Sequence, residues 1–313
     1  MPEYPKTVRE FRAAFPDETA CRAYLEQVRW PTGPRCPRCD QAKVWRLLPP
    51  SYRCAGCGYD FTVTVGTLLA DTRLPLSLWF EAMWYVVNQK NGASALGVQR
   101  VLGVSYLTAW RWLHKLRRVM VRTGRDRLAG VVEVDEVYIG GERPGKRGRG
   151  AEGKALVLVV AQAEEDHIGR IRLVRIANAT AAVLTAAVTT AVEPGTQVLT
   201  DAWSGYGGLT AAGYERREVR ASAIVGENLL PRANRVASLL QRWLLGTHQG
   251  AVAHSHLDYY LDEFVFRFNR RRSRSRGLLF HRLVEQTMAT APVRCPTLVG
   301  GTEPLNVGVS GTM

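Results

Sequence analysis

The chain has 313 residues, enough for one large domain and one or two small ones. Lys and Arg number 42 against 28 Asp and Glu, so the net charge is +14 and the pI is near 9.9. This excess of positive charge favours a polyanionic partner, most simply nucleic acid, over a role in general solubility.

The sequence contains no feature typical of export or membrane insertion. Residues 1–16 are mixed polar and charged and lack an apolar core of signal-peptide length. The longest purely apolar run, Ala155–Ala161, is far shorter than the roughly 20 residues with which a helix crosses a bilayer. We therefore expect a cytoplasmic protein without a membrane partner.

Five regions follow one another along the chain. Residues 1–30 form a helical segment, in which Asp17 is a suitable N-cap for a helix over Glu18–Val28. Residues 31–72 contain paired cysteines, residues 73–128 are helical, and residues 129–290 alternate strands and helices. Residues 291–313, rich in Gly, Pro and Thr, are expected to be a flexible tail.

Four cysteines form two tight pairs, Cys36-x2-Cys39 and Cys54-x2-Cys57. A tetrahedral zinc ion needs four soft ligands that converge from two tight turns, and this spacing supplies them. A redox role would need one such pair and not two. Since four Cys ligands leave no open coordination position, the sequence predicts a structural Zn²⁺ site in a zinc ribbon.

The helical region predicts a helix-turn-helix. A helix over about Ser94–Val101 is followed by a turn at Gly103 and a helix over about Tyr106–Met120. An apolar stripe on the second helix consists of Ala109, Leu113, Leu116 and Met120. The polar face includes the DNA-binding candidates Arg111, Lys115 and Arg118. The alternative is an ordinary helical hairpin with a solvated basic face.

Strands and helices alternate after residue 129. The pattern predicts strands over Val131–Ile139, Ala155–Ala163, Ile171–Ile176, Gln197–Thr200 and Glu215–Arg220, and helices over Ala181–Val192, from Pro231, and over Leu257–Phe268. This order is typical of a ribonuclease-H-like fold. The predicted fold class is therefore multidomain α+β, with a catalytic domain built as a mixed sheet flanked by helices.

Acidic residues accompany two of the predicted strands. Asp135 lies within an apolar strand, where a charge is costly unless it is paired or binds a metal. Glu133 shares its face, and Glu136 points to the other. Asp201 ends a second strand, and carboxylates on adjacent strands can hold two divalent ions about 4 Å apart for in-line phosphoryl transfer. The alternative is that Asp201 merely begins a turn.

Seven sequence blocks resemble those of bacterial insertion-sequence transposases of the fifteen-ninety-five (ISXO-like) family. In chain order they are FPDETACRAYLEQVRWPTGPRCPRCD, YRCAGCGYDFTVTVGTLLADTRLPL, VEVDEVYIGG, KRGRGAEGK, LTDAWSGYGGL, NRVASLLQRWLLGTHQG and LDEFVFRFNRRRSRSRG. They touch most of residues 10–285. The resemblance implies a DDE-type DNA transposase, nucleoid-associated, that cuts at element ends and joins 3′-hydroxyls to target DNA.

The resemblance also implies the catalytic positions. The first two fall on Asp135 and Asp201, with Mg²⁺ or Mn²⁺ as the catalytic metal. The third falls on Asn234, where relatives often carry His or an acid, and Gln241 stands where a Lys is often seen. An Asn carbonyl oxygen can bind Mg²⁺, although less tightly than a carboxylate. Asn at this position resembles an accepted variant in parts of the family.

Two basic stretches are candidates for contact with DNA phosphates. The first lies in a loop predicted between the first two strands and includes Lys146, Arg147 and Arg149. The second follows the last predicted helix and includes Arg270, Arg271 and Arg272. The alternative for the first stretch is a solvated loop.

The implied partners are double-stranded terminal inverted repeats and target DNA. A homodimer or higher oligomer is expected on DNA, because such transposases pair two element ends. Two alternatives remain open. The departures at Asn234 and Gln241 would suit a decayed copy that binds DNA without cutting it. A zinc-ribbon transcription regulator would have no metal-binding carboxylate site after residue 129.

Overall fold

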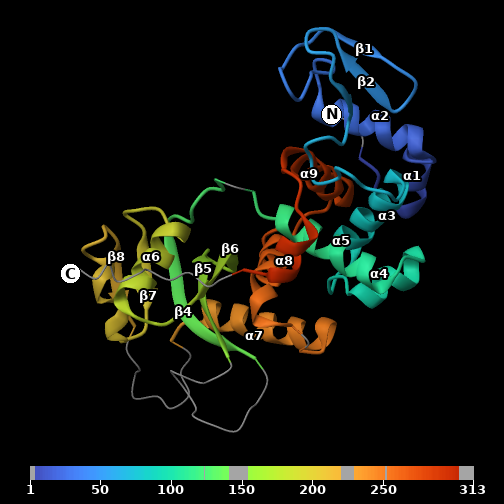
Figure 1. The fold of residues 1–313 in the computed structure, drawn as a ribbon. Coiled ribbons are helices and arrows are strands. Elements are labelled where there is room, and N and C mark those ends of the chain that lie inside the picture. Colours follow the sequence, from blue (N-terminus) through green and yellow to red (C-terminus); the bar gives the residue numbers. More distant parts are fainter. Residues whose placement is uncertain (1–3, 123, 141–153, 220–228, 251, 303–313) are drawn as a thin grey trace. The chain divides into compact units, whose positions relative to one another are not determined.

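The structure is a computed structural model that describes residues 4–122, 124–140, 154–219, 229–250 and 252–302 (Figure 1). The chain forms two compact units. The first comprises Met1–Arg122 and Ser273–Val299, and the second comprises Thr123–Arg272 and Gly300–Met313. Within the described ranges, none of the helices is both long enough and apolar enough to cross a membrane.

The first unit begins with two short helices and a small sheet. Its first elements are α1 (Val8–Ala14), α2 (Glu18–Arg29), β1 (Val44–Arg46), β2 (Ser51–Cys54) and β3 (Asp60–Thr62). The three strands pair antiparallel in the order β1-β2-β3. As the sequence predicts, the Asp17 side chain caps α2 by accepting a 2.8 Å hydrogen bond from the Ala20 N–H.

Three helices follow the small sheet: α3 (Leu76–Asn88), α4 (Ala95–Leu102) and α5 (Tyr106–Val119). Gly103 ends α4 in the left-handed conformation, with φ 67°, so the chain turns sharply into α5. The α4 and α5 helices pack on each other. All four residues of the apolar stripe predicted on α5 are buried.

The helix α9 (Arg276–Ala289) belongs to this first unit, which corrects the predicted domain boundary at residue 290. Its Phe280 ring packs against Phe11, Phe80 and Trp84, so burial of an aromatic cluster decides the grouping. The predicted loose tail is also partly wrong. It contains α10 (Cys295–Gly300), and the Thr302 N–H donates to the Ser255 carbonyl at 2.6 Å.

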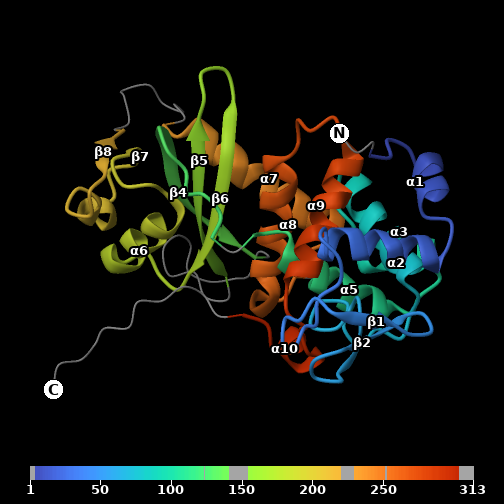
Figure 2. The same cartoon turned by 90° about the horizontal axis from the view of Figure 1, so that it is seen from above.

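The second unit is built on a five-stranded mixed sheet (Figures 1 and 2). The strands are β4 (Val131–Ile139), β5 (Ala155–Ala163), β6 (Ile168–Ile176), β7 (Gln197–Thr200) and β8 (Glu215–Glu218), in the order β6-β5-β4-β7-β8. The first three form an antiparallel meander, whereas β7 and β8 run parallel to β4. The strand pattern predicted from the sequence is therefore confirmed, although β6 already starts at Ile168.

Helices cover both faces of this sheet. One face packs on α6 (Ala181–Ala191) and the short helix η1 (Ser204–Leu209), with Val132 and Val134 of β4 in that core. The other packs on α7 (Pro231–His248) and α8 (Leu257–Asn269), which follows the short helix η2 (His254–His256). Because strand residues alternate between faces, Glu133 and Asp135 point to the α7 side of the sheet.

Candidate functional site

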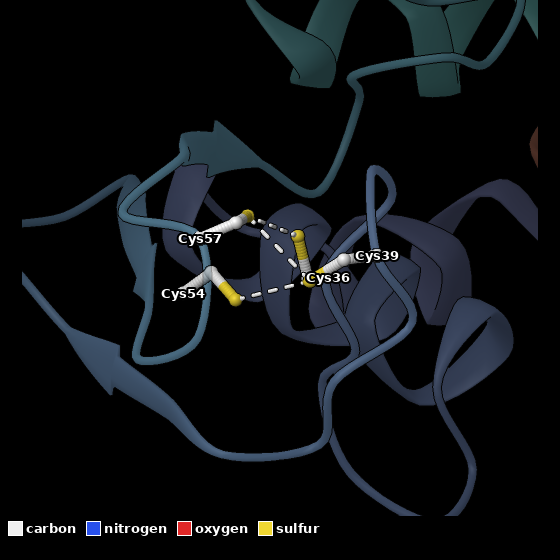
Figure 3. A group of neighbouring side chains, drawn as sticks. All are labelled: Cys36, Cys39, Cys54 and Cys57. Carbon is white, nitrogen blue, oxygen red and sulfur yellow. Dashed lines mark hydrogen bonds between the residues drawn. The ribbon is translucent and has the colours of Figure 1, made fainter.

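The four paired cysteines converge in the small sheet of the first unit (Figure 3). Their sulfur atoms all lie within 4.8 Å of one another. The Cys39 sulfur is 3.5 Å from those of Cys54 and Cys57, and the Cys36 and Cys57 sulfurs are 3.7 Å apart. With Zn–S bonds of about 2.3 Å, the edges of a tetrahedron are about 3.8 Å, so this group fits a structural zinc ion.

The two cysteine pairs adopt the same tight turn. In each, the residue after the second Cys has positive φ, 57° at Asp40 and 66° at Gly58. Its N–H donates to the carbonyl of the first Cys, at 2.9 Å for Asp40 and 3.0 Å for Gly58. The backbone N–H of Cys57, followed by that of Gly56, lowers the pKa of the Cys54 thiol to about 7, which favours the metal-binding thiolate.

The sheet of the second unit aligns the two predicted catalytic aspartates. Along the parallel strands β4 and β7, Val131 pairs with Gln197 and Glu133 pairs with Leu199. If this pairing is extended by two residues, Asp135 falls opposite Asp201, which is the residue directly after β7. Since neighbouring strands lie about 4.8 Å apart, this register brings the two positions to the same level of adjacent chains.

The two aspartates both affect the pKa of a buried tyrosine. Tyr206 in η1 is fully buried, and burial raises the pKa of its hydroxyl. The carboxylates of Glu136, Asp135 and Asp201 raise that pKa further. Acidic side chains of β4 and of the residue after β7 therefore both act on the pKa of this hydroxyl.

Hydrogen bonds from the backbone and from β8 hold the Asp201 segment. The Asp201 carboxylate accepts a hydrogen bond from the Trp203 N–H at 3.0 Å. Arg216 of β8 donates to the Asp201 carbonyl at 3.2 Å and to the Thr200 hydroxyl at 3.1 Å. Asp201 thus does begin a turn, but it does so in line with Asp135, so the two interpretations left open by the sequence are compatible.

Glu133 fastens α7 to β4. Its side chain is 2% exposed, and Oε2 accepts hydrogen bonds from the N–H groups of Arg232 at 2.6 Å and Ala233 at 3.0 Å. Oε1 accepts one from the Arg232 guanidinium at 3.1 Å. The residue before α7 is Leu230, which offers no side-chain cap. A carboxylate from a distant strand therefore caps this helix, directly before Asn234.

The helix α7 follows β4 beyond that cap. Two turns after Asn234, the Gln241 side chain donates to the carbonyl of Tyr138 at 3.4 Å. The helix is thus attached to β4 near Glu133 and again near Tyr138, with Asp135 between these points on the strand. Asn234 lies in the segment of α7 that spans this interval, on the side of the sheet toward which Asp135 points.

The three DNA-binding candidates on α5 differ in exposure. Arg118 is exposed, whereas Arg111 is half-buried. The Lys115 ammonium lies 5.9 Å from the centre of the Trp79 ring, so part of its side chain covers that ring. Among these candidates, Arg118 is the most accessible to a phosphate.

The basic residues after α8 divide into two kinds. Arg270 and Arg271 lie over the rings of Phe266 and Phe268, at 4.2 Å and 4.0 Å, and donate to nearby backbone carbonyls. Arg272 is exposed and lines a cavity of about 340 Å³ with Arg170, Arg271 and His167. Burial, and then the charge of Arg272, lower the pKa of Arg271. Lys146, Arg147 and Arg149 lie outside the described residues.

Sequence reasoning missed the cap from Glu133, although two signals were present. An unpaired acidic residue stood on an apolar strand face, and the helix that starts at Pro231 is preceded by Leu230, which cannot cap it. It also missed Arg216, whose distinction from other strand arginines arises only from its contacts with Thr200 and Asp201.

Comparisons with known proteins identify two regions. A family model described as the ISXO2-like transposase domain, of IS1595 transposases, matches residues 127–269. A second, described as the transposase zinc-ribbon domain of the same group, matches residues 16–60. No protein with a curated description matches the chain.

One solved structure with detectable similarity is the crystal structure of the Mos1 strand transfer complex. The similarity has a TM-score of 0.22 and 11% sequence identity, and it covers 61% of this chain and 75% of that one. The assignment therefore depends on the two domain matches, which contain the cysteine cluster and both aspartates in the expected order. The chain thus contains a region that matches the ISXO2-like transposase domain and a region that matches the zinc-ribbon domain of IS1595 transposases.

Proposed function

We propose that this transposase cuts at the ends of its insertion sequence and joins the resulting 3′-hydroxyls to target DNA. Asp135 and Asp201 would bind Mg²⁺ or Mn²⁺, with Asn234 as a weaker third ligand. The observation that carries the proposal is the parallel register of β4 and β7, which aligns the two aspartates.

The chemistry is phosphoryl transfer in two steps. In the first, a water oxygen bonds to phosphorus at the element end, and the 3′-oxygen leaves and gains a proton. In the second, that 3′-oxygen bonds to a target phosphorus while a target 3′-oxygen leaves. A divalent ion, when bound, supplies activation of the attacking oxygen and charge stabilisation of the leaving oxygen.

Residues of the chain would position this chemistry. The two carboxylates hold negative charge at one level of the sheet, and Arg216 orients the Asp201 backbone. The cap by Glu133 holds the start of α7, and with it Asn234, against β4. The site would thus be assembled from a strand, a strand end and a helix of a ribonuclease-H-like domain.

DNA recognition would fall to the first unit. The zinc ribbon and the α4–α5 helix-turn-helix would bind the terminal inverted repeats, with contacts from Arg111, Lys115 and Arg118. Arg272, with Arg270, Arg271 and the segment containing Lys146, Arg147 and Arg149, would contact phosphates of the DNA being processed. Two copies would act together, because two DNA ends must be joined.

Strand transfer tests the proposal. Full-length protein is incubated with Mg²⁺, target plasmid and duplexes that carry the inverted repeats flanking its gene. We expect wild type to join the duplexes to the plasmid. The control variant Glu215→Gln, which changes an exposed acid of β8, should do the same, and Asp135→Asn should give no joined product. Equal activity of wild type and Asp135→Asn would refute the assignment of the active site.

A second candidate function is DNA binding without cleavage, and the neutral side chains of Asn234 and Gln241 favour it. It predicts no strand transfer by wild type and the appearance of activity in Asn234→Glu. A zinc-ribbon transcription regulator is disfavoured, because residues 127–269 match a transposase domain.

A further inference from the structure

Apolar side chains are exposed where α5 begins. Tyr106 and Leu107, the first two residues of the helix, are each 50% exposed. The face of α5 opposite Leu107 is well packed, with Ala109, Leu113 and Leu116 buried. Solvent exposure of two large apolar side chains on the first turn is unfavourable in the isolated molecule, so this turn is a candidate contact surface.

The first turn of α5 is held rigidly. The Ser105 hydroxyl accepts a 3.1 Å hydrogen bond from the Thr108 N–H, which caps the helix. Gly103 places the preceding turn in the left-handed conformation, and α4 packs against α5. Tyr106 and Leu107 are therefore presented on a preformed helix end, which limits the entropy lost when a partner binds.

The charge around this turn identifies the partner. Between Glu81 and Asp126 the sequence contains eight Lys and Arg and no Asp or Glu. Leu107 lies one helical turn before Arg111 and on the same side of α5 as the exposed Arg118. Apolar side chains within a chain segment whose charged residues are all basic suit a polyanion that carries apolar groups, and duplex DNA with thymine methyl groups is such a molecule.

We propose that the first turn of α5 reads thymine 5-methyl groups in the DNA major groove, with Leu107 as the main contact and Tyr106 beside it. This inference rests on the proposed role of α4–α5 in DNA binding. In a helix-turn-helix, the N-terminal residues of the second helix contact base edges. In the major groove, thymine differs from the other bases by its methyl group, which favours apolar side chains.

The size of the effect follows from the area of a methyl group. Removal of one buried methyl group lowers affinity about fourfold. Replacing thymine by uracil removes only that group and leaves every hydrogen-bonding edge and phosphate intact. A duplex read at one or two thymines should therefore bind about 4-fold to 16-fold less tightly when it contains uracil.

The test uses the full-length, zinc-loaded protein. A binding site is first selected from a pool of random duplexes, and the enriched duplex is then synthesised with thymine or with uracil. Dissociation constants are measured for wild type, Leu107→Ser, Tyr106→Ser and the control Val101→Ser. Val101 is 59% exposed and lies in the last turn of α4, so it tests the loss of an exposed apolar side chain outside α5.

We expect wild type and Val101→Ser to prefer thymine by at least about fourfold. Leu107→Ser should lose most of the thymine preference and bind the thymine duplex at close to the affinity of wild type for the uracil duplex, and Tyr106→Ser should lose a smaller part of that preference. Unchanged circular dichroism of each variant shows that the helices remain folded. Lys115→Ala should weaken binding to both duplexes by the same factor.

Three results would overturn the inference. Equal binding of thymine and uracil duplexes by wild type would refute methyl reading while leaving sequence-specific binding intact. Failure of any duplex to enrich would refute the proposed DNA recognition as well. Leu107→Ser could also keep the thymine preference and lose self-association in the absence of DNA. That result would assign the first turn of α5 to a contact between copies of the chain.

Discussion

The zinc cluster and the carboxylate site are assembled over very different lengths of chain. All four cysteines lie in the one short segment from Cys36 to Cys57. Two tight turns within this segment bring the four sulfur atoms together. Between Asp135 in β4 and Asp201 lie β5, β6, α6 and β7, and η1 and β8 come before Asn234. One site is formed by local turns, whereas the other exists only when a sheet and a helix have packed.

Helix capping shows the same contrast between local and distant contacts. Asp17 caps its own helix, α2, from the position directly before it. By contrast, α3 and α7 follow Pro75 and Leu230, which provide no side-chain cap. Glu18 accepts hydrogen bonds from Leu76 and Ser77 at the start of α3, and Glu133 does so for α7. Each unit thus relies on one distant carboxylate to position a helix.

The largest expected effect concerns the local site. Cys54→Ser should abolish zinc binding and unfold the ribbon, because structural zinc contributes about 10 kcal/mol or more to small zinc-binding folds. Cys21→Ala, which removes a buried thiol outside the cluster, should retain zinc. Zinc content per chain and limited proteolysis of residues 30–62 measure the result. A Cys54→Ser protein that still bound one zinc ion per chain and still resisted proteolysis would contradict the assignment of a structural zinc site to the four cysteines.

The carboxylate site should behave in the opposite way, with loss of activity and retention of the fold. Asp201→Asn is expected to lower the rate of strand transfer at least about 100-fold, because one charged ligand is lost at the reacting centre. Its melting temperature should stay close to that of wild type. Asp166→Asn, on the exposed turn between β5 and β6, serves as the control. Cooperative unfolding of Asp201→Asn at room temperature would indicate a structural role instead.

Glu133 should affect both stability and activity. Glu133→Ala removes the acceptor of two helix N–H groups and of one guanidinium N–H of Arg232, which should cost about 2 kcal/mol of unfolding free energy. Because the start of α7 is then less firmly held, strand transfer should require a higher Mg²⁺ concentration for half-maximal rate.

The matched control for Glu133→Ala is Glu18→Ala, which removes the equivalent cap from α3. It should destabilise the first unit by a similar amount and leave the Mg²⁺ requirement unchanged. If both variants shift the Mg²⁺ requirement equally, Glu133 acts only through general stability.

The last effect depends on pH and leaves the proposed active site untouched. Burial raises the pKa of Asp262 in α8 from its usual 3.8 to about 7, with Arg125 opposing and Asp258 reinforcing the rise. The folded state therefore keeps a proton that the unfolded chain releases near pH 4, and stability declines as pH rises from about 4 to 7. Asp262→Asn should remove this decline, on the order of 4 kcal/mol over the full range from pH 4 to 7. The free energy of unfolding of wild type and of Asp262→Asn is measured by urea denaturation at several pH values. The same pH dependence in both proteins would contradict the interpretation that Asp262 is a buried, protonated acid.

Much of the local structure could be predicted from sequence patterns. The cap at Asp17, the apolar stripe on α5 and the strand over Val131–Ile139 each depend on residues close in the chain, and each is confirmed. The grouping of α9 with the first unit could not be predicted. It depends on the packing of Phe280 against Phe11 and Trp84, which belong to the opposite end of the chain.

The amino-acid sequence by itself determined the zinc ribbon, the order of strands and helices, and the match to two transposase domains. These features depend on spacing, periodicity and motifs, which act over a few residues at a time. Only the tertiary structure decided that β4 and β7 are parallel neighbours, in a register that leads Asp135 toward Asp201, and that Glu133 holds the helix of Asn234. Strand register and helix docking are set by burial of the two faces of the sheet, and that burial is a property of the whole folded unit.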